Sequence, residues 1–229
     1  MKSLYTTLLL ALLLSLPGSL AAADKAIERM DNAAEVLDEI MASGDRSIPS
    51  DLLNKAHCVV IVPGLKKGGF IFSGKYGKGV FSCRGAEGKG WTAPATIRIE
   101  GGGFGLQIGG SSSDVILLVM NEKGKNKLVS SKFTVGADAA AAAGPVGRTA
   151  QAQTDAQMRA EILSYSRSRG VFAGVSLEGA TLRPDNEDNK KIYGSEIAVR
   201  DVVNGDIPAP ASAKLLLDTL TKYSSEEHR

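Results

Sequence analysis

The stretch HCVVIVPGLKKGGFIFSGKYGKGVFSCR, residues 57–84, alternates short apolar runs with glycine-bearing turns. Its β-branched and aromatic runs predict strands over His57–Val62, Phe70–Ser73 and Val80–Arg84. The glycines of Gly74–Gly79 predict a turn between the last two of these strands. Because the strands follow one another so closely, the stretch favours antiparallel hairpins over strand–helix–strand units.

The same alternation continues toward the C-terminus. Further strands are predicted over Ala95–Glu100, Phe104–Ile108 and Val115–Met120, and two more over Tyr165–Leu177 that meet near Gly170. Glycine makes up 26 of the 229 residues, which exceeds its usual share of about 7%. Such an excess is typical of a β-rich domain with tight turns and close backbone contacts.

Helices are predicted at both ends of this β-rich middle. Asp24–Met41 places apolar residues on one side and charges on the other, as in an amphipathic helix. Ser212 is positioned to cap a last helix with an apolar stripe, formed by Leu215, Leu216, Leu220 and Tyr223. Shorter helices are predicted over 50–56, 123–132, 155–162 and 197–203, whereas 137–143 fits a helix or a strand and 184–193 a helix or a loop. The sequence therefore predicts a single α+β domain with a curled, mostly antiparallel β-sheet or small barrel and helices at both ends.

The first 23 residues, MKSLYTTLLLALLLSLPGSLAAA, have the layout of a secretory signal peptide. Lys2 supplies the positive start, Leu8–Leu16 the apolar run, and Ala21 and Ala23 the small residues of a cleavage site. The run is too short to span the ~30 Å hydrocarbon core of a bilayer. We therefore expect residues 1–23 to be removed, a domain over residues 24–229, and export to the periplasm or cell envelope of a bacterium.

Charge and motif content argue against several function classes. The chain carries 27 Lys and Arg against 25 Asp and Glu, a net charge of +2, which argues against a bulk nucleic-acid binder. Its two histidines, His57 and His228, and the lack of H-E-x-x-H and C-x-x-C motifs argue against a zinc site. The stretch GFIFSGK, residues 69–75, begins like a phosphate-binding loop, but Tyr76 stands where Ser or Thr would hold magnesium. We expect no enzyme activity, no metal and no cofactor.

Cys58 and Cys83 are the two cysteines of the chain. In an oxidising compartment such a pair predicts a disulfide. If the strand Phe70–Ser73 lay between their strands in a simple meander, the cysteines would be about 10 Å apart, beyond the roughly 7 Å limit between bridged Cα atoms. The predicted bond therefore requires the strands of Cys58 and Cys83 to be neighbours, or the sheet to curl tightly.

Six basic residues lie at predicted turns and strand junctions: Lys66, Lys67, Lys75, Lys78, Arg167 and Arg169. The first two follow a Pro-Gly turn, the next two lie in the following turn, and the arginines flank a strand junction. Cations on hairpin tips can meet anionic phosphates without desolvating a whole face. These six are therefore the candidate lipid-binding residues. Trp91, the single tryptophan, fits either a core anchor or a wedge that enters lipid.

Several sequence blocks, in one order, resemble the SYLF family of lipid-binding domains. The segment ILSYSRSRGVFAGVSLEG, residues 162–179, is similar to the signature of that family. The other blocks are VVIVPGLKKGGF (59–70), GWTAP (90–94), GLQIGGSSSD (105–114), GPVGR (144–148), and Asn189 with Tyr193-Gly194. The resemblance covers residues 33–222, which is nearly all of the predicted mature chain.

The resemblance implies a membrane-lipid-binding domain and not an enzyme. Eukaryotic relatives bind phosphoinositides, often through basic surface residues and an amphipathic N-terminal helix, and a yeast branch is linked to actin. An exported bacterial protein meets no host actin in its own cell, so the actin role is not expected here. Anionic phospholipid or lipopolysaccharide fits a bacterial envelope better than a phosphoinositide. The alternative is a structural or protein-interaction module of the periplasm without direct lipid binding.

The predicted N-terminal helix is acidic. Against Lys25 and Arg29 it carries six carboxylates, from Asp24, Glu28, Asp31, Glu35, Asp38 and Glu39. An anionic bilayer would repel such a face. We therefore expect this helix to pack on the domain, and the basic turns to contact the membrane.

Overall fold

The computed structural model describes residues 17–44, 47–69, 72–85, 88, 90–104, 109–146, 159–168, 171–175 and 177–224. The strands are β1 (Cys58–Gly69), β2 (Phe72–Cys83), β3 (Ala95–Phe104), β4 (Gly109–Val119), β5 (Phe133–Thr134), β6 (Ala141–Ala143), β7 (Ile162–Ser168), β8 (Val171–Gly174) and β9 (Thr181–Pro184). The helices are α2 (Pro17–Met41), α3 (Ser50–Lys55), α4 (Glu122–Leu128), α6 (Asn186–Tyr193), α7 (Val199–Asn204), the 3-10 turn η5 (Ala211–Ala213) and α8 (Lys214–Tyr223).

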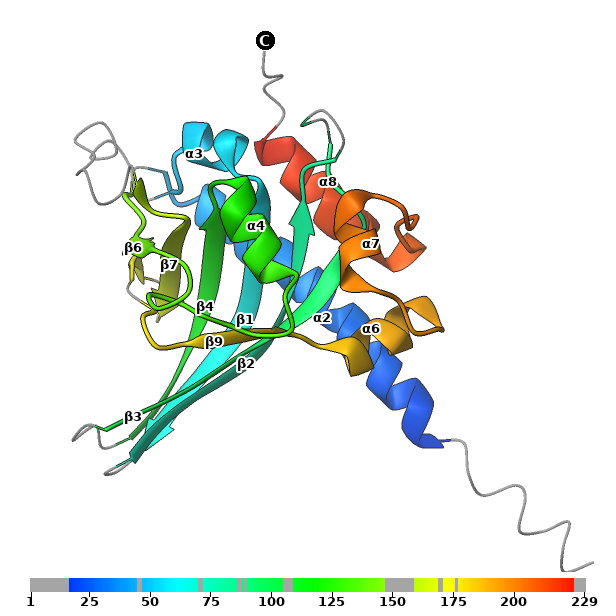
Figure 1. Ribbon diagram of the computed structural model, residues 1–229, viewed down its shortest axis with the longest axis horizontal. Helices are drawn as coiled ribbons and strands as arrows, with labels where there is room; N and C mark the ends of the chain where they lie inside the picture. Colours follow the sequence, from blue (N-terminus) through cyan, green and yellow to red (C-terminus); the bar gives the residue numbers. More distant parts are fainter. Residues whose placement is uncertain are drawn as a thin grey trace, which may run out of the picture.

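The strands form one curled sheet of nine strands, counted over the described residues. Their order is β5-β9-β3-β2-β1-β4-β7-β6, and β8 also pairs with β7. The pairings are antiparallel except that of β6 with β7. Helices lie at both ends of the chain order (Figure 1). The predicted α+β domain with a curled, mostly antiparallel sheet is therefore confirmed.

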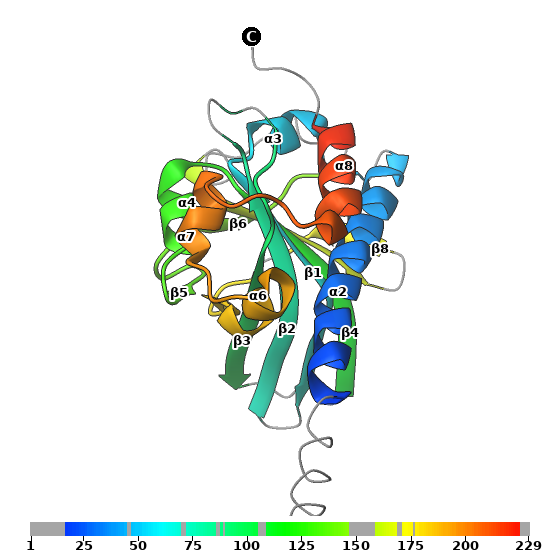
Figure 2. The same cartoon turned by 90° about the vertical axis from the view of Figure 1, so that its right-hand side faces the viewer.

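Two apolar cores lie on opposite faces of the sheet. Side chains alternate along a strand, so Val60 faces the first core whereas Val59 and Ile61 face the second. The first core joins Phe133 of β5 to Ile162 of β7, which come from opposite ends of the strand order, so it fills the inside of the curl. The second core lies under α2 and α8, which pack side by side (Figure 2).

β1 and β2 form one long hairpin, although the sequence predicted three short strands here. The predicted strand Phe70–Ser73 is not a separate strand, because β2 runs from Phe72 to Cys83 without a break. The predicted turn Gly74–Gly79 lies inside β2 and pairs with β1 and β3. Because no strand separates them, Cys58 and Cys83 are direct cross-strand partners. Glycines that the sequence pattern assigned to a turn therefore serve the interior of a strand.

The Pro63-Gly64 pair is a bulge in β1 and not the turn that the sequence predicted. The register of β1 with β2 shifts between Ile61 and Lys66, which absorbs the extra residues. Gly64 has a φ of +62°, a conformation that favours glycine. Its amide N–H donates to Asp114 Oδ1 at 2.9 Å. The strand therefore continues past the proline, as bulges permit.

β3 and β4, which pair with β2 and β1 and not with each other, also extend through glycines. β3 continues through the three glycines at 101–103 to Phe104, and β4 begins at Gly109. The remainder of the predicted strand Phe104–Ile108, residues 105–108, lies outside the described residues. The two strands predicted over Tyr165–Leu177 are confirmed as β7 and β8, although Gly170 between them lies outside the described residues.

Several helices lie where the sequence predicted them, but their caps and buried faces differ from the prediction. Ser212 lies inside η5 and makes no side-chain cap hydrogen bond to α8, so the predicted cap is wrong. In the predicted apolar stripe of α8, Leu216 and Leu220 are buried but Leu215 is 50% exposed. Residues 137–143 supply the short strand β6, and the polar stretch after Pro184 forms α6. Most of the helix predicted over 155–162 lies outside the described residues, and β7 starts at Ile162.

The N-terminal helix packs on the domain, as its acidic face predicted. α2 contacts β1, β2, α6 and α8. It begins at Pro17, so it includes the last seven residues of the predicted signal peptide, and residues 1–16 lie outside the described residues. Within the described part of the chain, no helix is both long enough and apolar enough to cross a membrane. Signal-peptide cleavage stays a prediction.

Candidate anion-binding site at the sheet end

The central strands β1 to β4 project beyond the helices at one end of the molecule (Figure 1). Near this end lie Lys66 and Lys67 of β1 and Lys75 of β2. Together with Tyr76, Ser111 and Ser112 they line a shallow groove of about 570 Å³. We call these six residues the basic strand end. Three of the six predicted lipid-binding cations are therefore neighbours, but they lie on strands and not on turns.

The register places the three lysines on both faces of the sheet. Lys67 pairs directly with Lys75, so their side chains share one face. Lys66 pairs with Tyr76, and these two share the opposite face. The projecting end therefore presents cationic side chains to either side, which is the arrangement of a positively charged edge and not of an enclosed cavity.

The lysines of the basic strand end lack carboxylate partners. Among the described residues, none of the ammonium groups of Lys66, Lys67 and Lys75 forms an ion pair with a carboxylate. Lys75 instead donates weakly to the backbone carbonyl of Glu178, at 3.5 Å. Burial and the charge of Lys67 lower the pKa of the Lys75 ammonium below its usual value. Like charges directly opposite on a sheet destabilise it, and a bound anion would relieve that cost.

Hydroxyl groups flank these cations. Ser111 lies opposite Lys67, and Ser112 lies opposite Lys66, on the neighbouring strand β4. Tyr76 is 47% exposed, which is unusual for a large aromatic side chain in this protein. A tyrosine ring with one apolar body and one polar tip suits the boundary between water and lipid. Each face of the projecting end therefore offers charge and a hydroxyl donor, and the face of Lys66 adds the amphipathic ring of Tyr76.

Lys78, the fourth predicted lipid-binding lysine, belongs to a different site. Its Nζ lies 2.7 Å from Asp185 Oδ2 and 2.9 Å from Asp188 Oδ2. Burial disfavours its charge, but the hydrogen bonds to both aspartates outweigh burial and raise the pKa of Lys78. The Lys78 side chain is 26% exposed, against 4% for Asp188. Lys78 is therefore a structural cation, held inside the fold by two carboxylates.

Asp188 is the centre of that structural network, which the sequence did not reveal. Arg29 of α2 reaches the same carboxylate with its Nη1 at 2.9 Å, and Lys191 reaches its other oxygen at 3.1 Å. Burial alone would raise the pKa of Asp188, but Lys78, Lys191 and Arg29 together lower it. Across the described residues, no group of three or more His, Cys, Asp and Glu side chains is placed to hold a metal ion.

Arg167, another of the predicted lipid-binding residues, does not join the basic strand end. Arg167 of β7 donates to Asp114 Oδ2 from Nε at 3.0 Å and from Nη2 at 2.7 Å. It also pairs with Glu39 of α2. Since Asp114 in turn accepts the amide of Gly64, Arg167 supports the bulge and the helix. Arg169 lies outside the described residues.

The predicted disulfide and Trp91 both lie near the other end of the β1–β2 hairpin, away from the projecting end. Cys58 and Cys83 form a disulfide with a Cα–Cα distance of 3.9 Å. Trp91 is partly buried against the second core, and its ring lies 4.1 Å from the guanidinium of Arg84. Its Nε1–H donates to Ser224 Oγ at 3.0 Å. Trp91 is therefore a packing anchor, remote from the projecting sheet end.

Comparison with known proteins identifies the family. Residues 100–223, more than half of the chain, match the family described as "Ysc84: Las17-binding protein actin regulator". The chain belongs to the Ysc84 family. This is the SYLF family that the sequence blocks resembled.

Relatives with this Ysc84 region are longer proteins. SH3 domain-containing YSC84-like protein 1 of Rattus norvegicus is 33% identical over 190 residues, which cover 81% of this chain and 55% of the relative. Protein YSC84 of Saccharomyces cerevisiae is 34% identical over 181 residues, which cover 77% of this chain and 38% of the relative. The chain therefore spans between 38% and 55% of the length of these two relatives.

Two Ysc84-family blocks meet at a close backbone contact. A Cβ on Gly144 would lie 2.0 Å from the ring of Tyr165, and a Cβ on Gly174 would lie 2.1 Å from the carbonyl oxygen of Gly144. Tyr165 is fully buried, and burial raises the pKa of its hydroxyl. These glycines and the tyrosine therefore serve packing between β7, β8 and the segment after β6, and they are not candidates for ligand binding.

Proposed function

We propose that this chain is a non-enzymatic binding protein that contacts anionic phospholipid surfaces through the basic strand end. The observation that supports it most is the direct pairing of Lys67 with Lys75, two cations with no carboxylate partner among the described residues. They lie on an end of the sheet that projects from the domain (Figure 1). Lys66 and Tyr76 on the other face extend the contact. We further propose that the chain is exported and acts at the bacterial cell envelope.

Vesicle flotation tests this function. The full chain is mixed with phosphatidylcholine vesicles that either contain or lack phosphatidylglycerol. We expect flotation only with the anionic vesicles, and weaker binding in high salt, because salt screens exposed charges. A basic residue near such a surface contributes about 1 kcal/mol. The triple variant Lys66→Glu/Lys67→Glu/Lys75→Glu should therefore bind at least about 100-fold more weakly.

A matched triple variant separates the site from net charge. Lys55→Glu/Lys132→Glu/Lys190→Glu changes the net charge by the same amount at exposed lysines on other surfaces. It should keep most of the wild-type binding. Equal losses in both triple variants would reject the basic strand end as the site, and equal flotation with neutral vesicles would reject the electrostatic contact.

A further inference from the structure

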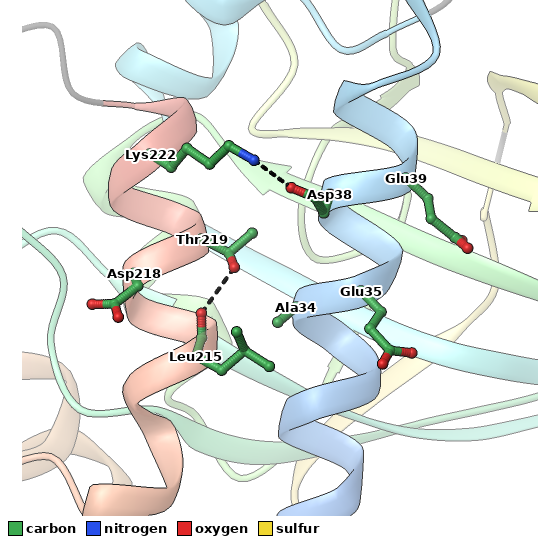
Figure 3. Close-up of a pocket in the computed structure, with 8 residues that line it drawn as sticks. All are labelled: Ala34, Glu35, Asp38, Glu39, Leu215, Asp218, Thr219 and Lys222. Carbon is green, nitrogen blue, oxygen red and sulfur yellow. Dashed lines mark hydrogen bonds and ion pairs between the residues drawn. The ribbon is translucent and has the colours of Figure 1, made fainter.

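A groove runs between α2 and α8 on the outer side of the second core. Its volume is about 590 Å³. Its lining combines an apolar centre, from Ala34 and Leu215, with four carboxylates, from Glu35, Asp38, Glu39 and Asp218 (Figure 3). The same two helices bury Leu37, Leu216 and Leu220 beneath it. The groove is therefore a surface feature of two helices that pack against each other.

Leu215 is the apolar feature of the groove. It is 50% exposed, whereas its helix neighbours Leu216 and Leu220 are almost fully buried. Figure 3 shows its side chain directed toward Ala34 of α2. Exposed leucines are ordinary when they are scattered, but this one lies between two helices and is flanked by acidic rims. That combination is typical of a groove that accepts an amphipathic helix.

The charge of the groove is negative and partly unpaired. Lys222 bridges the two helices at one end, where its Nζ lies 2.7 Å from Asp38 Oδ1 (Figure 3). Glu39 pairs with Arg167, and Asp218 pairs with Lys214. Further along α2, four carboxylates make no ion pair with any described residue, those of Asp24, Glu28, Asp31 and Glu35. A cationic partner would therefore meet Glu35 in the groove, and a longer partner would meet the other three carboxylates on α2 beyond the groove.

We propose that this groove is a docking site for a basic amphipathic helix of a partner protein. A third helix laid between α2 and α8 would place an apolar side chain on the exposed Leu215, beside the buried Ala34. Its Lys and Arg side chains would face Glu35 and the rest of the acidic rim, which favours this partner over an acidic one. The inference rests on the groove alone and does not depend on the lipid contact.

A second copy of the chain is a poorer occupant. The most basic helix among the described residues is α4, and its Lys123 and Lys125 already pair with Glu161 and Glu122. An anionic membrane is excluded by the sign of the rim. Figure 2 shows α8 beside the upper part of α2, while the free ends of β2 and β3 point downward. A helix in the groove would therefore leave the basic strand end accessible.

Binding of a designed peptide tests the groove. The probe is a fluorescein-labelled helical peptide of about five turns, with leucines on one face and lysines on its flanks, as helix-in-groove recognition requires. Fluorescence anisotropy is measured against the full chain at low salt. We expect saturable binding, and about tenfold weaker binding for each of Leu215→Asp and Glu35→Lys, because each removes a central contact. The same peptide with glutamates in place of its lysines should not bind.

Glu196→Lys is the matched control, because Glu196 is exposed and lies outside the groove. It should bind the basic peptide like the wild type. Equal binding by wild type, Leu215→Asp and Glu35→Lys would overturn the proposal, and so would equal binding of the acidic peptide. Self-association that Leu215→Asp abolishes would assign the groove to a second copy and would also overturn it. None of these outcomes depends on vesicle binding, so the two proposals fail separately.

Discussion

At the scale of single residues, the glycines of β2 differ in what a side chain would meet. A Cβ on Gly79 would lie 2.3 Å from the carbonyl oxygen of Ile61, and one on Gly77 would lie 2.8 Å from Leu65 Cδ1. A Cβ on Gly74 would meet nothing within 4 Å. Gly77 and Gly79 therefore permit close contact between β1 and β2 at the bulge, whereas no close contact depends on Gly74.

Gly79→Ala should destabilise the fold. The added methyl group would collide with backbone, which cannot rotate away, so we expect a loss of about 1–3 kcal/mol in the free energy of unfolding. Gly74→Ala in the same strand should change it by less than about 0.5 kcal/mol. Urea unfolding followed by circular dichroism measures both. Equal stabilities of the two variants would show that the contact at Gly79 is not tight.

At the scale of elements, buried Asp188 joins α2, β2 and α6 through Arg29, Lys78 and Lys191. Asp188→Ala should leave these cations without their partner and reduce the free energy of unfolding by about 3 kcal/mol, as in other buried ion pairs that lose one member. Glu187→Ala, at an exposed neighbouring position, should cost no more than about 0.5 kcal/mol. Urea titration of both variants decides whether the network holds the elements together.

The same network has a predictable pH dependence. Because the pKa of Asp188 is lowered in the folded chain, the carboxylate makes its full contribution to the free energy of unfolding above the unfolded-state pKa of about 4. It is lost as the pH falls through the lower folded-state pKa. The stability difference between wild type and Asp188→Ala should therefore be constant from pH 5 to 7 and shrink below about pH 4. A difference that stays constant to pH 2 would mean that the carboxylate charge is irrelevant.

The disulfide fixes the end of the β1–β2 hairpin away from the projecting tip. It closes a loop with a sequence separation of 25, which contributes roughly 3 kcal/mol in the chain-entropy account. Reduction of the wild type should lower its unfolding midpoint in urea accordingly. Cys58→Ala/Cys83→Ala should show the reduced midpoint with and without reductant. An unfolding midpoint of the wild type that is the same with and without reductant would indicate that the disulfide does not stabilise the fold.

The sequence predicted which segments form strands better than where each strand ends. Apolar runs identified the strands around Val60, Phe81 and Ile97. The predicted disulfide required the strands of the two cysteines to be neighbours or the sheet to curl tightly, and they are neighbours. Glycine pattern could not distinguish a turn from a bulged strand interior, because both need small residues, so the predicted turns around Lys66 and Lys75 were wrong. Lys78 and Arg167 meet their partners Asp188 and Asp114 only through the tertiary fold, since these lie 110 and 53 residues away in the chain.

At the scale of the whole molecule, a net charge of +2 conceals two regions of opposite sign. The basic strand end lies where the sheet projects, and the acidic groove lies between α2 and α8. Figure 2 shows α8 beside the upper part of α2, and the ends of β2 and β3 toward the bottom of the view. Contact of the strand end with an anionic surface would keep the acidic groove beside α8 away from that surface, which reduces repulsion.

The fluorescence of one tryptophan at the basic strand end tests this arrangement most directly. Tyr76→Trp places a reporter at the exposed end, while Trp91, held by Arg84 and Ser224, supplies the wild-type reference. With phosphatidylglycerol vesicles we expect a blue shift in the Tyr76→Trp chain and an unchanged wild-type spectrum. A blue shift of equal size in the wild type, or no shift in Tyr76→Trp while the chain floats with the vesicles, would contradict contact through the basic strand end.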